Sequence, residues 1–251
     1  MHADDLFPLF YHTQHQKYLE DLPFWLSLAV THGSPILELG CGSGRVLLPL
    51  ALAGHRVLGI DNDPGMLALL QKHLLPDVKH RTSLLLADIS RIPLVEQFGL
   101  IVMPCNTLST LSQQAQAAVL REVRSHLAQD GVFAVSLSNP ELLRAMPRLA
   151  EPEVDDTFLH PLSGEPVQVS SGWKKTSNSL VITWHYDHLL PDGRVERLTS
   201  QVQHRLDSLH DYLDAFSAAG LQVERLFGDY DSSAYQPDSE NLIILARSTG
   251  F

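Results

Sequence analysis

The stretch PILELGCGSGR, residues 35–45, sets the architecture of this 251-residue chain. Residues 35–39 form an apolar run typical of a buried strand, and residues 45–53 have helical character and end at a glycine cap. Between them stand Gly40, Gly42 and Gly44, so that a strand, a tight loop and a helix follow one another. Such a loop brings the backbone close to a ligand at the positive end of a helix, which indicates a nucleotide-like ligand.

Strands and helices alternate on both sides of this loop. Residues 6–29, punctuated by Pro8 and Pro23, predict a lead-in of two short helices. After the loop we expect a strand at 55–61, a helix at 65–75, strands at 83–87 and 100–103, a helix at 112–127, and a strand at 131–136 after a turn at 129–131. Repeated β-α-β units of this kind predict a parallel sheet.

The pattern changes after residue 150. The acidic run at 151–156 is typical of a solvated linker, and strand-like runs follow at 167–173, 180–188 and 194–206, with a hairpin turn at 191–193. A helix at 208–219 and strands at 222–227 and 241–247 then predict an antiparallel pair that closes the sheet. We therefore expect a helical lead-in and cofactor-binding core at 1–150, a β insertion at 151–206, and a return to the core at 207–251.

Composition and charge exclude several classes of protein. Hydrophobic residues make up 44% and charged residues 19% of the chain, which is typical of a folded globular protein, and no apolar run is long enough to span a membrane. The net charge of −11 disfavours nucleic acid as a partner. The start, MHADD, lacks the features of a secretory signal, and two cysteines are too few for a disulfide framework, so we expect a cytoplasmic protein.

The spacing of the glycine loop separates two kinds of nucleotide ligand. Dinucleotide-binding proteins carry G-x-G-x-x-G and place a pyrophosphate at the helix end. This chain has G-x-G-x-G with an acidic residue, Glu38, just ahead of it. A carboxylate there would repel a pyrophosphate but attract an aminoacyl ammonium group, which favours S-adenosylmethionine over NAD.

Acidic and amide side chains follow the next three strands in an order that suits the same ligand. Asp61 comes about 20 residues after the loop, where a carboxylate accepts hydrogen bonds from both ribose hydroxyls. Asp88, after the third strand, is placed to accept from the adenine amino group. Asn106, in the sequence MPCNT after the fourth strand, is expected to face the transferring methyl group.

This ordered set resembles the class I S-adenosylmethionine-dependent methyltransferases, and the segment around GDYD (228–231) resembles their small-molecule subgroup, which includes N-methyltransferases of amino sugars and glycine. The resemblance implies a Rossmann-like sheet of seven strands, mostly parallel with an antiparallel last strand, and a small antiparallel β insertion that acts as a lid over the acceptor. It implies that the cofactor contacts Tyr11, Glu38, Gly40, Cys41, Gly42, Gly44, Arg45, Asp61, Asn62, Met66, Ala87, Asp88, Ile89, Pro104, Cys105 and Asn106.

Several weaker signals concern the acceptor and the chemistry. Trp184 and Tyr186 share one face of a predicted strand and form either an acceptor wall or ordinary core. Arg205, Asp229 and Tyr230 either bind the acceptor or cap the last hairpin. His15, Tyr11 and Tyr230 are candidates for receiving a proton, although a dedicated base is not required, because the sulfonium already activates the methyl group. We expect no metal site.

The sequence leaves the acceptor open. A small-molecule methyltransferase that acts at nitrogen or oxygen by direct in-line transfer is the favoured interpretation, since strand four lacks the Asn/Asp-Pro-Pro-Tyr pattern of enzymes that methylate nucleobases or glutamine amides. The alternatives are a protein or tRNA methyltransferase and a module that binds S-adenosylmethionine without turnover. The oligomeric state is also open, with a homodimer among the alternatives.

Overall fold

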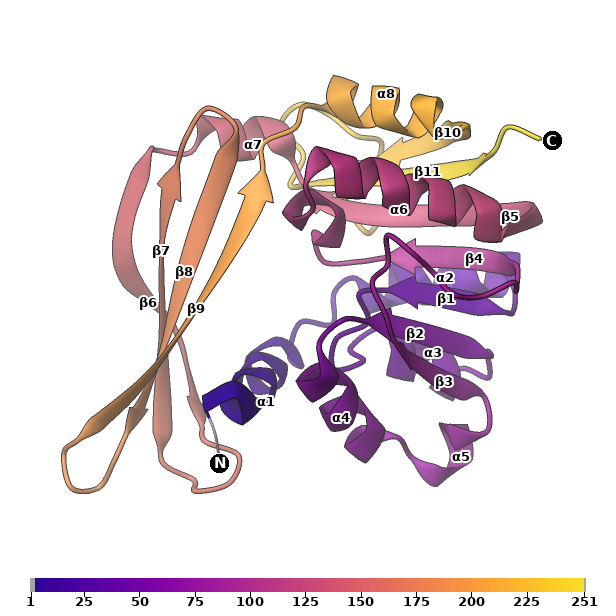
Figure 1. Ribbon diagram of the computed structural model, residues 1–251. Coiled ribbons are helices and arrows are strands. Elements are labelled where there is room, and N and C mark those ends of the chain that lie inside the picture. The colour runs from indigo at the N-terminus through magenta and orange to yellow at the C-terminus, as the bar shows by residue number, and fades with distance from the viewer. Residues whose placement is uncertain (1–2, 251) are drawn as a thin grey trace.

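A computed structural model describes residues 3–250 of the chain; Met1 and His2, on which part of the prediction about the amino terminus rests, lie outside them. Two sheets organise the molecule (Figure 1). The larger has seven strands in the order β10-β11-β5-β4-β1-β2-β3, and the smaller has four in the order β6-β7-β8-β9. The strands are β1 (Ile36–Leu39), β2 (Val57–Asp61), β3 (Thr82–Leu86), β4 (Phe98–Met103), β5 (Leu127–Ser138), β6 (Leu149–Leu159), β7 (Pro166–Lys175), β8 (Ser179–Leu189), β9 (Val195–Arg205), β10 (Leu221–Phe227) and β11 (Asn241–Ser248).

The helices cover both faces of the larger sheet. They are α1 (Ala3–His15), α2 (Leu22–His32), α3 (Leu47–Leu52), α4 (Pro64–His73), α5 (Pro76–Lys79), the 3-10 helix η1 (Thr107–Thr110), α6 (Gln113–His126), α7 (Pro140–Ala145) and α8 (Leu209–Ala218). One buried cluster packs α6 and α8 against the face that carries Leu37, and a second packs α2, α3 and α4 against the face that carries Ile36. Burial of both faces explains why these strands read as continuous apolar runs rather than as alternating patterns.

The pairing of the strands confirms the predicted Rossmann-like sheet. β1 pairs in parallel with β2 and β4, whereas β11 runs antiparallel to both β5 and β10. The separate four-stranded antiparallel sheet is also present, and its strands β7, β8 and β9 match the three predicted runs. The parallel arrangement brings the carboxyl ends of β1, β2, β3 and β4 to one edge, where polar side chains from distant parts of the sequence meet.

Some local predictions were wrong. The acidic run at 151–156 is not a linker but part of the edge strand β6, whose side chains in that run are largely exposed; charges on an edge strand keep it from pairing with other chains. The predicted turn at 129–131 lies inside β5 as an irregularity, since Phe98 pairs with Leu127 but Leu100 pairs with Val132. The two predicted lead-in helices are present as α1 and α2, with Pro8 inside α1 and Pro23 in the first turn of α2.

Helix α8 is held at its start by a capping box. The Ser208 side chain accepts a hydrogen bond from the Asp211 amide, and the Asp211 carboxylate accepts one from the Ser208 amide. We expect Ser208→Ala to lower the free energy of unfolding by about 1 kcal/mol, because an amide at the helix start loses its partner. Urea unfolding would measure this, with Ser125→Ala, an exposed position near the end of α6, as the control that changes little.

Candidate functional site

The glycine loop lies at the carboxyl end of β1 and is fixed by its neighbour β2. The amides of Gly40 and Cys41 both donate to the carbonyl of Ile60, and the Gly42 amide donates to the Asp61 carboxylate at 2.7 Å. Gly42 has a φ of +51°, and a Cβ atom added there would meet no other atom within 4 Å. The backbone at Gly42 therefore faces open space, as a loop that lies close to a ligand requires, whereas Gly40 and Gly44 pack against Thr107 and Leu70.

Glu38 provides the strongest chemical indication of what the ligand carries. The residue is buried at the end of β1, and its Oε2 atom has no hydrogen-bond partner among the described residues. Burial raises the pKa of this carboxyl well above its usual range. A buried carboxyl with an unpaired oxygen is costly unless a donor meets it. The aminoacyl ammonium group of S-adenosylmethionine would supply that donor, whereas a phosphate would be repelled, so the residues present fit this cofactor.

Arg45 belongs to a network that the sequence analysis did not find. Its guanidinium donates to both carboxylate oxygens of Asp21, at 2.5 and 2.7 Å, and to the Cys105 thiol at 2.8 Å. The indole nitrogen of Trp25 also donates to Asp21. Asp21 is buried just before α2 and so ties the lead-in to the glycine loop. The position of Asp21 at the start of a predicted helix is the only signal in the sequence. That position does not reveal that Asp21 pairs with Arg45, 24 residues away.

Helix α1 covers the glycine loop. The His12 ring lies 3.0 Å from the Ser43 hydroxyl, and a Cβ atom on Gly65 would meet the ring of Pro8, so α1 packs closely on the start of α4. Tyr11 stacks on His15 with ring centroids 4.0 Å apart. Burial raises the pKa of Tyr11 to about 12, and Cys105, Arg45 and Asp61 all lie within electrostatic reach of its hydroxyl. The structure thus brings Tyr11 and His15 to the loop.

The strands β2 and β3 place the other predicted cofactor residues along the same edge. Asp61 accepts from the amide of Asp63 at 2.9 Å in addition to that of Gly42, so its carboxylate also shapes the loop. Asn62 is exposed directly after it, and Met66 is buried in the first turn of α4. Asp88 is exposed after β3, between half-buried Ala87 and buried Ile89, and a hydrogen bond from Ser90 lowers its pKa.

The turn after β4 has an unusual backbone. Cys105 and Asn106 have φ values of +61° and +63°, a region that costs energy for residues with a side chain. The Asn106 side-chain oxygen accepts the Ser138 amide, which joins this turn to the end of β5. Asn106 therefore has a structural partner in addition to the predicted role near the methyl group. Pro104 is buried, whereas Cys105 is an exposed residue whose thiol accepts a hydrogen bond from Arg45.

Three residues considered for acceptor binding have other partners. Tyr186 is 1% exposed and packs against Phe10 of α1, and its hydroxyl donates to Gln14, so it belongs to the core between α1 and the small sheet. Asp229 accepts from the Tyr230 amide and from Asn241, which makes it a cap of the last hairpin. Arg205 forms two hydrogen bonds with Asp207.

Two other acceptor candidates retain accessible surface. Trp184 is half-buried on the same face as Tyr186. Tyr230 packs on Phe24 and Trp25, and burial raises the pKa of its hydroxyl to about 12.

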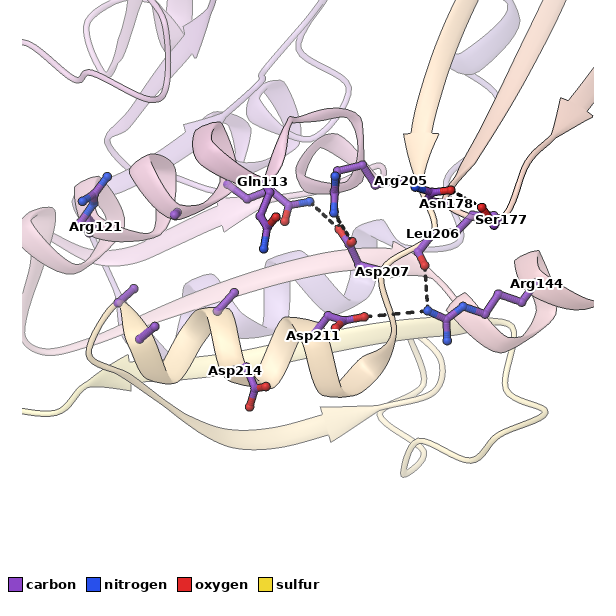
Figure 2. Close-up of a pocket in the computed structure, with 15 residues that line it drawn as sticks. Gln113, Arg121, Arg144, Ser177, Asn178, Arg205, Leu206, Asp207, Asp211 and Asp214 are labelled. Carbon is purple, nitrogen blue, oxygen red and sulfur yellow. Dashed lines mark hydrogen bonds and ion pairs between the residues drawn. The ribbon is translucent and has the colours of Figure 1, made fainter.

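A cavity of about 760 Å³ lies elsewhere, between α6, α8 and the end of β9 (Figure 2). The sticks in Figure 2 show Arg205 turned toward Asp207, and Arg144 turned toward the Leu206 carbonyl and Asp211. Arg144 and Arg205 thus face carboxylates, and the cavity contains none of the residues of the glycine loop. We assign the chemistry to the strand edge instead, because the buried carboxyl, the open glycine backbone and the aromatic pair of α1 meet there.

Comparisons with known proteins agree with this geometry. A family model described as a methyltransferase domain matches residues 36–131. The putative methyltransferase YqeM of Bacillus subtilis (strain 168) is 22% identical over 230 residues, which cover 90% of this chain and 88% of that protein. The structure of an S-adenosylmethionine-dependent methyltransferase from Clostridium acetobutylicum ATCC 824 is 16% identical and superposes with a TM-score of 0.78 over 96% of this chain and 98% of that one. The chain is a class I S-adenosylmethionine-dependent methyltransferase.

A further solved structure extends the likeness of this methyltransferase across both sheets. The sugar N-methyltransferase KedS8 from Streptoalloteichus sp ATCC 53650 is 20% identical and superposes with a TM-score of 0.74 over 96% of this chain and 92% of that one. Within residues 3–250 of the methyltransferase, no group of three or more His, Cys, Asp or Glu side chains is placed to hold a metal ion. Across the same residues, no helix has the length and hydropathy that crossing a bilayer requires.

Histidines at the contacts between α1, the small sheet and the core make the stability of the methyltransferase depend on pH. Burial lowers the pKa of His15 and His204 below the ordinary value of 6.5. The unfolded chain therefore binds more protons at these groups, and their contribution to stability is lost as the pH falls below 6.5. Glu38 acts in the opposite direction, because its raised pKa favours proton uptake by the folded chain. A variant that removes one histidine separates the two effects.

When the pH is lowered from about 7.5 to about 5.5, we expect the Tm of His204→Gln to fall by a few degrees less than the Tm of the wild type. Each kcal/mol of stability shifts Tm by roughly 2–4 °C in a domain of this size. Differential scanning calorimetry would measure the difference. His210→Gln, at an exposed position on α8, is the control that should follow the wild type. Equal falls in the wild type and His204→Gln would contradict the expectation.

Proposed function

We propose that this enzyme transfers a methyl group from S-adenosylmethionine to a nitrogen atom of a small molecule. The observation that carries the proposal is the position of α1 and the small sheet. α1 packs on the glycine loop through His12 and Ser43, and the small sheet packs on α1 through Tyr186 and on η1 through His204. The edge of the sheet is thereby covered from two sides, which suits a small acceptor. Nitrogen as the methylated atom is supported by the similarity to the sugar N-methyltransferase KedS8.

The residues proposed to hold the cofactor are those that meet at the strand edge. Glu38 would accept from the ammonium group, Asp61 from the ribose hydroxyls and Asp88 from the adenine amino group, while the glycine backbone leaves room for the cofactor. When bound, the cofactor supplies a methyl group on a sulfonium, an electrophile that needs no further activation. The protein then has to position the acceptor, exclude water and hold the proton that the acceptor loses.

His15 is the proposed proton acceptor. Its Nδ1 atom lies 2.8 Å from the Tyr11 carbonyl, which can only accept, so Nδ1 carries the proton and Nε2 keeps its lone pair. Burial lowers the pKa of His15, so the ring is neutral at neutral pH. Tyr11, whose raised pKa keeps its hydroxyl protonated, can donate a hydrogen bond beside it. We expect kcat/KM to rise with pH through the pKa of His15 and to lose that rise in His15→Gln but not in His185→Gln, an exposed control.

A screen of small amines and alcohols with the enzyme and S-adenosylmethionine, with mass detection of methylated products, tests the proposal. Products methylated at nitrogen would support it. Cofactor binding without turnover on a broad panel would favour a sensor module instead. Methylation of tRNA or of protein side chains in the absence of small-molecule turnover would favour the remaining alternative.

A further inference from the structure

The small sheet presents an inner face toward the core. Directly paired residues of antiparallel strands share a face, so Val169, Tyr186 and Leu198 lie together, as do Lys175, Leu180 and His204. The first group packs against Phe10 of α1. In the second, Leu180 is fully buried and His204 lies 2.9 Å from the Ser109 hydroxyl of η1. The inner face is thus held against the rest of the enzyme at both ends.

Between these two ends the inner face is only partly covered. Along β8, Tyr186 and Leu180 are buried, but Ile182 and Trp184 between them are half-buried, and so is Val202, the partner of Ile182 on β9. The two ends are six residues apart, or roughly 20 Å at 3.3 Å per residue. We name Ile182, Trp184 and Val202 the inner strip. Large apolar side chains left partly accessible between two sealed contacts mark a place for an apolar ligand.

Charge further restricts what the inner strip accepts. The residues opposite Trp184 on the flanking strands are Ser171 and Ser200, so the strip itself carries no charge. On the same face, the ammonium group of Lys175 is engaged by the carbonyls of Arg144 and Met146, and Asp156 is paired with Lys17 at 2.6 Å. A carboxylate or phosphate bound here would be desolvated, and the Lys175 and Lys17 ammonium groups of this face, within the described part of the chain, already have partners.

We propose that the methyl acceptor has an uncharged, apolar body that packs on the inner strip, with its amine directed to Tyr11 and His15. This inference rests on the proposed function, since it describes the acceptor of that same reaction. The strip is continuous with the core around Phe10, which places it next to the helix that carries Tyr11. Trp184, Ile182 and Val202 are then the residues that select the acceptor, whereas the cofactor residues are shared by any acceptor.

Binding of matched amines tests the proposal without turnover. The probes are aryl and alicyclic primary amines such as benzylamine, each compared with an analogue that adds a carboxylate, such as 4-(aminomethyl)benzoate. Calorimetry with the enzyme saturated with S-adenosylhomocysteine should show at least one pair in which the amine without the carboxylate binds at least tenfold more tightly than its analogue. Equal binding within every pair, preference for the carboxylates, or no binding by any probe would overturn the proposal.

Two adjacent substitutions provide a matched control. Val202 lies on the inner face, and Gln203 is exposed on the outer face of the same strand. Val202→Glu should weaken binding of the amine that lacks the carboxylate at least tenfold with unchanged affinity for S-adenosylhomocysteine, while Gln203→Glu stays within twofold of the wild type. The amine should also change the tryptophan emission of the wild type. Trp173, the partner of Ile182 on β7, shares the inner face with Trp184, so the change should become smaller in Trp184→Phe and be lost in Trp173→Phe/Trp184→Phe. This readout does not depend on the folding of Val202→Glu. The assignment would be refuted if Val202→Glu and Gln203→Glu had equal effects, or if the emission change were undiminished in Trp184→Phe and persisted in Trp173→Phe/Trp184→Phe.

The outcomes separate this inference from the proposed function. If matched amines bind on the strip but none is methylated, the proposed reaction fails while the ligand chemistry of the strip holds. If the enzyme methylates amines whose binding is unchanged by Val202→Glu, the proposed reaction holds and the proposed role of the inner strip is refuted. If the strip instead covers a second copy of the chain, the wild type will sediment as a dimer and Val202→Glu as a monomer without a change in amine binding, which also refutes it.

Discussion

Asp61→Ala is expected to weaken binding of S-adenosylmethionine about 100-fold. The carboxylate is proposed to accept from the ribose hydroxyls, and it also accepts from the amides of Gly42 and Asp63 in the protein alone. Removing it therefore deletes charged hydrogen bonds to the cofactor and loosens the glycine loop, and each such bond contributes about 1.5–3 kcal/mol. A 100-fold loss corresponds to about 2.7 kcal/mol. Isothermal titration calorimetry measures it directly.

The neighbouring Asp63 supplies the control for this result. Its carboxylate accepts from the amides of Gly65 and Met66 and so caps α4. Asp63→Ala should lower stability by about 1 kcal/mol, as the loss of a helix cap does, with a much smaller effect on cofactor affinity. Unchanged affinity in Asp61→Ala, or equal losses in the two variants, would remove Asp61 from the cofactor site.

Asp21→Ala should have the largest effect on folding. Its carboxylate is buried and accepts two hydrogen bonds from Arg45 and one from Trp25. Without it the guanidinium of Arg45 stays largely buried and loses its carboxylate partner, a change that costs about 3–5 kcal/mol. Urea unfolding in the absence of cofactor would measure the loss.

An exposed ion pair of equal length provides the comparison. Arg56 and Glu96 also lie 2.5 Å apart, but both are well exposed to solvent, so Glu96→Ala should cost less than about 1 kcal/mol. A second check is the double variant Asp21→Asn/Arg45→Met, which removes both charges and should recover part of the stability lost in Asp21→Ala. If Asp21→Ala costs no more than Glu96→Ala, the network does not hold the lead-in to the loop.

The fold could be predicted from local patterns because those patterns have local causes. The G-x-G-x-G loop needs positive φ values at Gly40, Gly42 and Gly44, and the structure shows +73°, +51° and +87°. Each buried parallel strand is a continuous apolar run, so it can be recognised from its own sequence without knowledge of its neighbours. β6 was missed for the converse reason, since an exposed edge strand needs few apolar residues and its acidic sequence is typical of a linker.

The candidate site was less predictable where partners are distant in sequence. Tyr186 and Trp184 share a face, as their spacing indicates, but only the position of α1 decides that one is buried and the other half-open. For Arg205 and Asp229 the sequence left acceptor binding and capping of the last hairpin as alternatives, because their partners, Asp207 and Asn241, are seen only in the structure. No sequence pattern pairs Asp21 with Arg45, because their meeting depends on how the lead-in docks against the loop.

The small sheet enters from the core after α7 and returns to it before α8, so it is joined to the rest of the enzyme by only two crossings of the chain. Random libraries confined to β7, β8 and β9 would therefore vary the part of the enzyme proposed to bind the acceptor, while every residue proposed to hold the cofactor, from Tyr11 to Asn106, stays unchanged. Such a layout lets new acceptor preferences arise, in nature or in the laboratory, at little risk to the shared methyl donor.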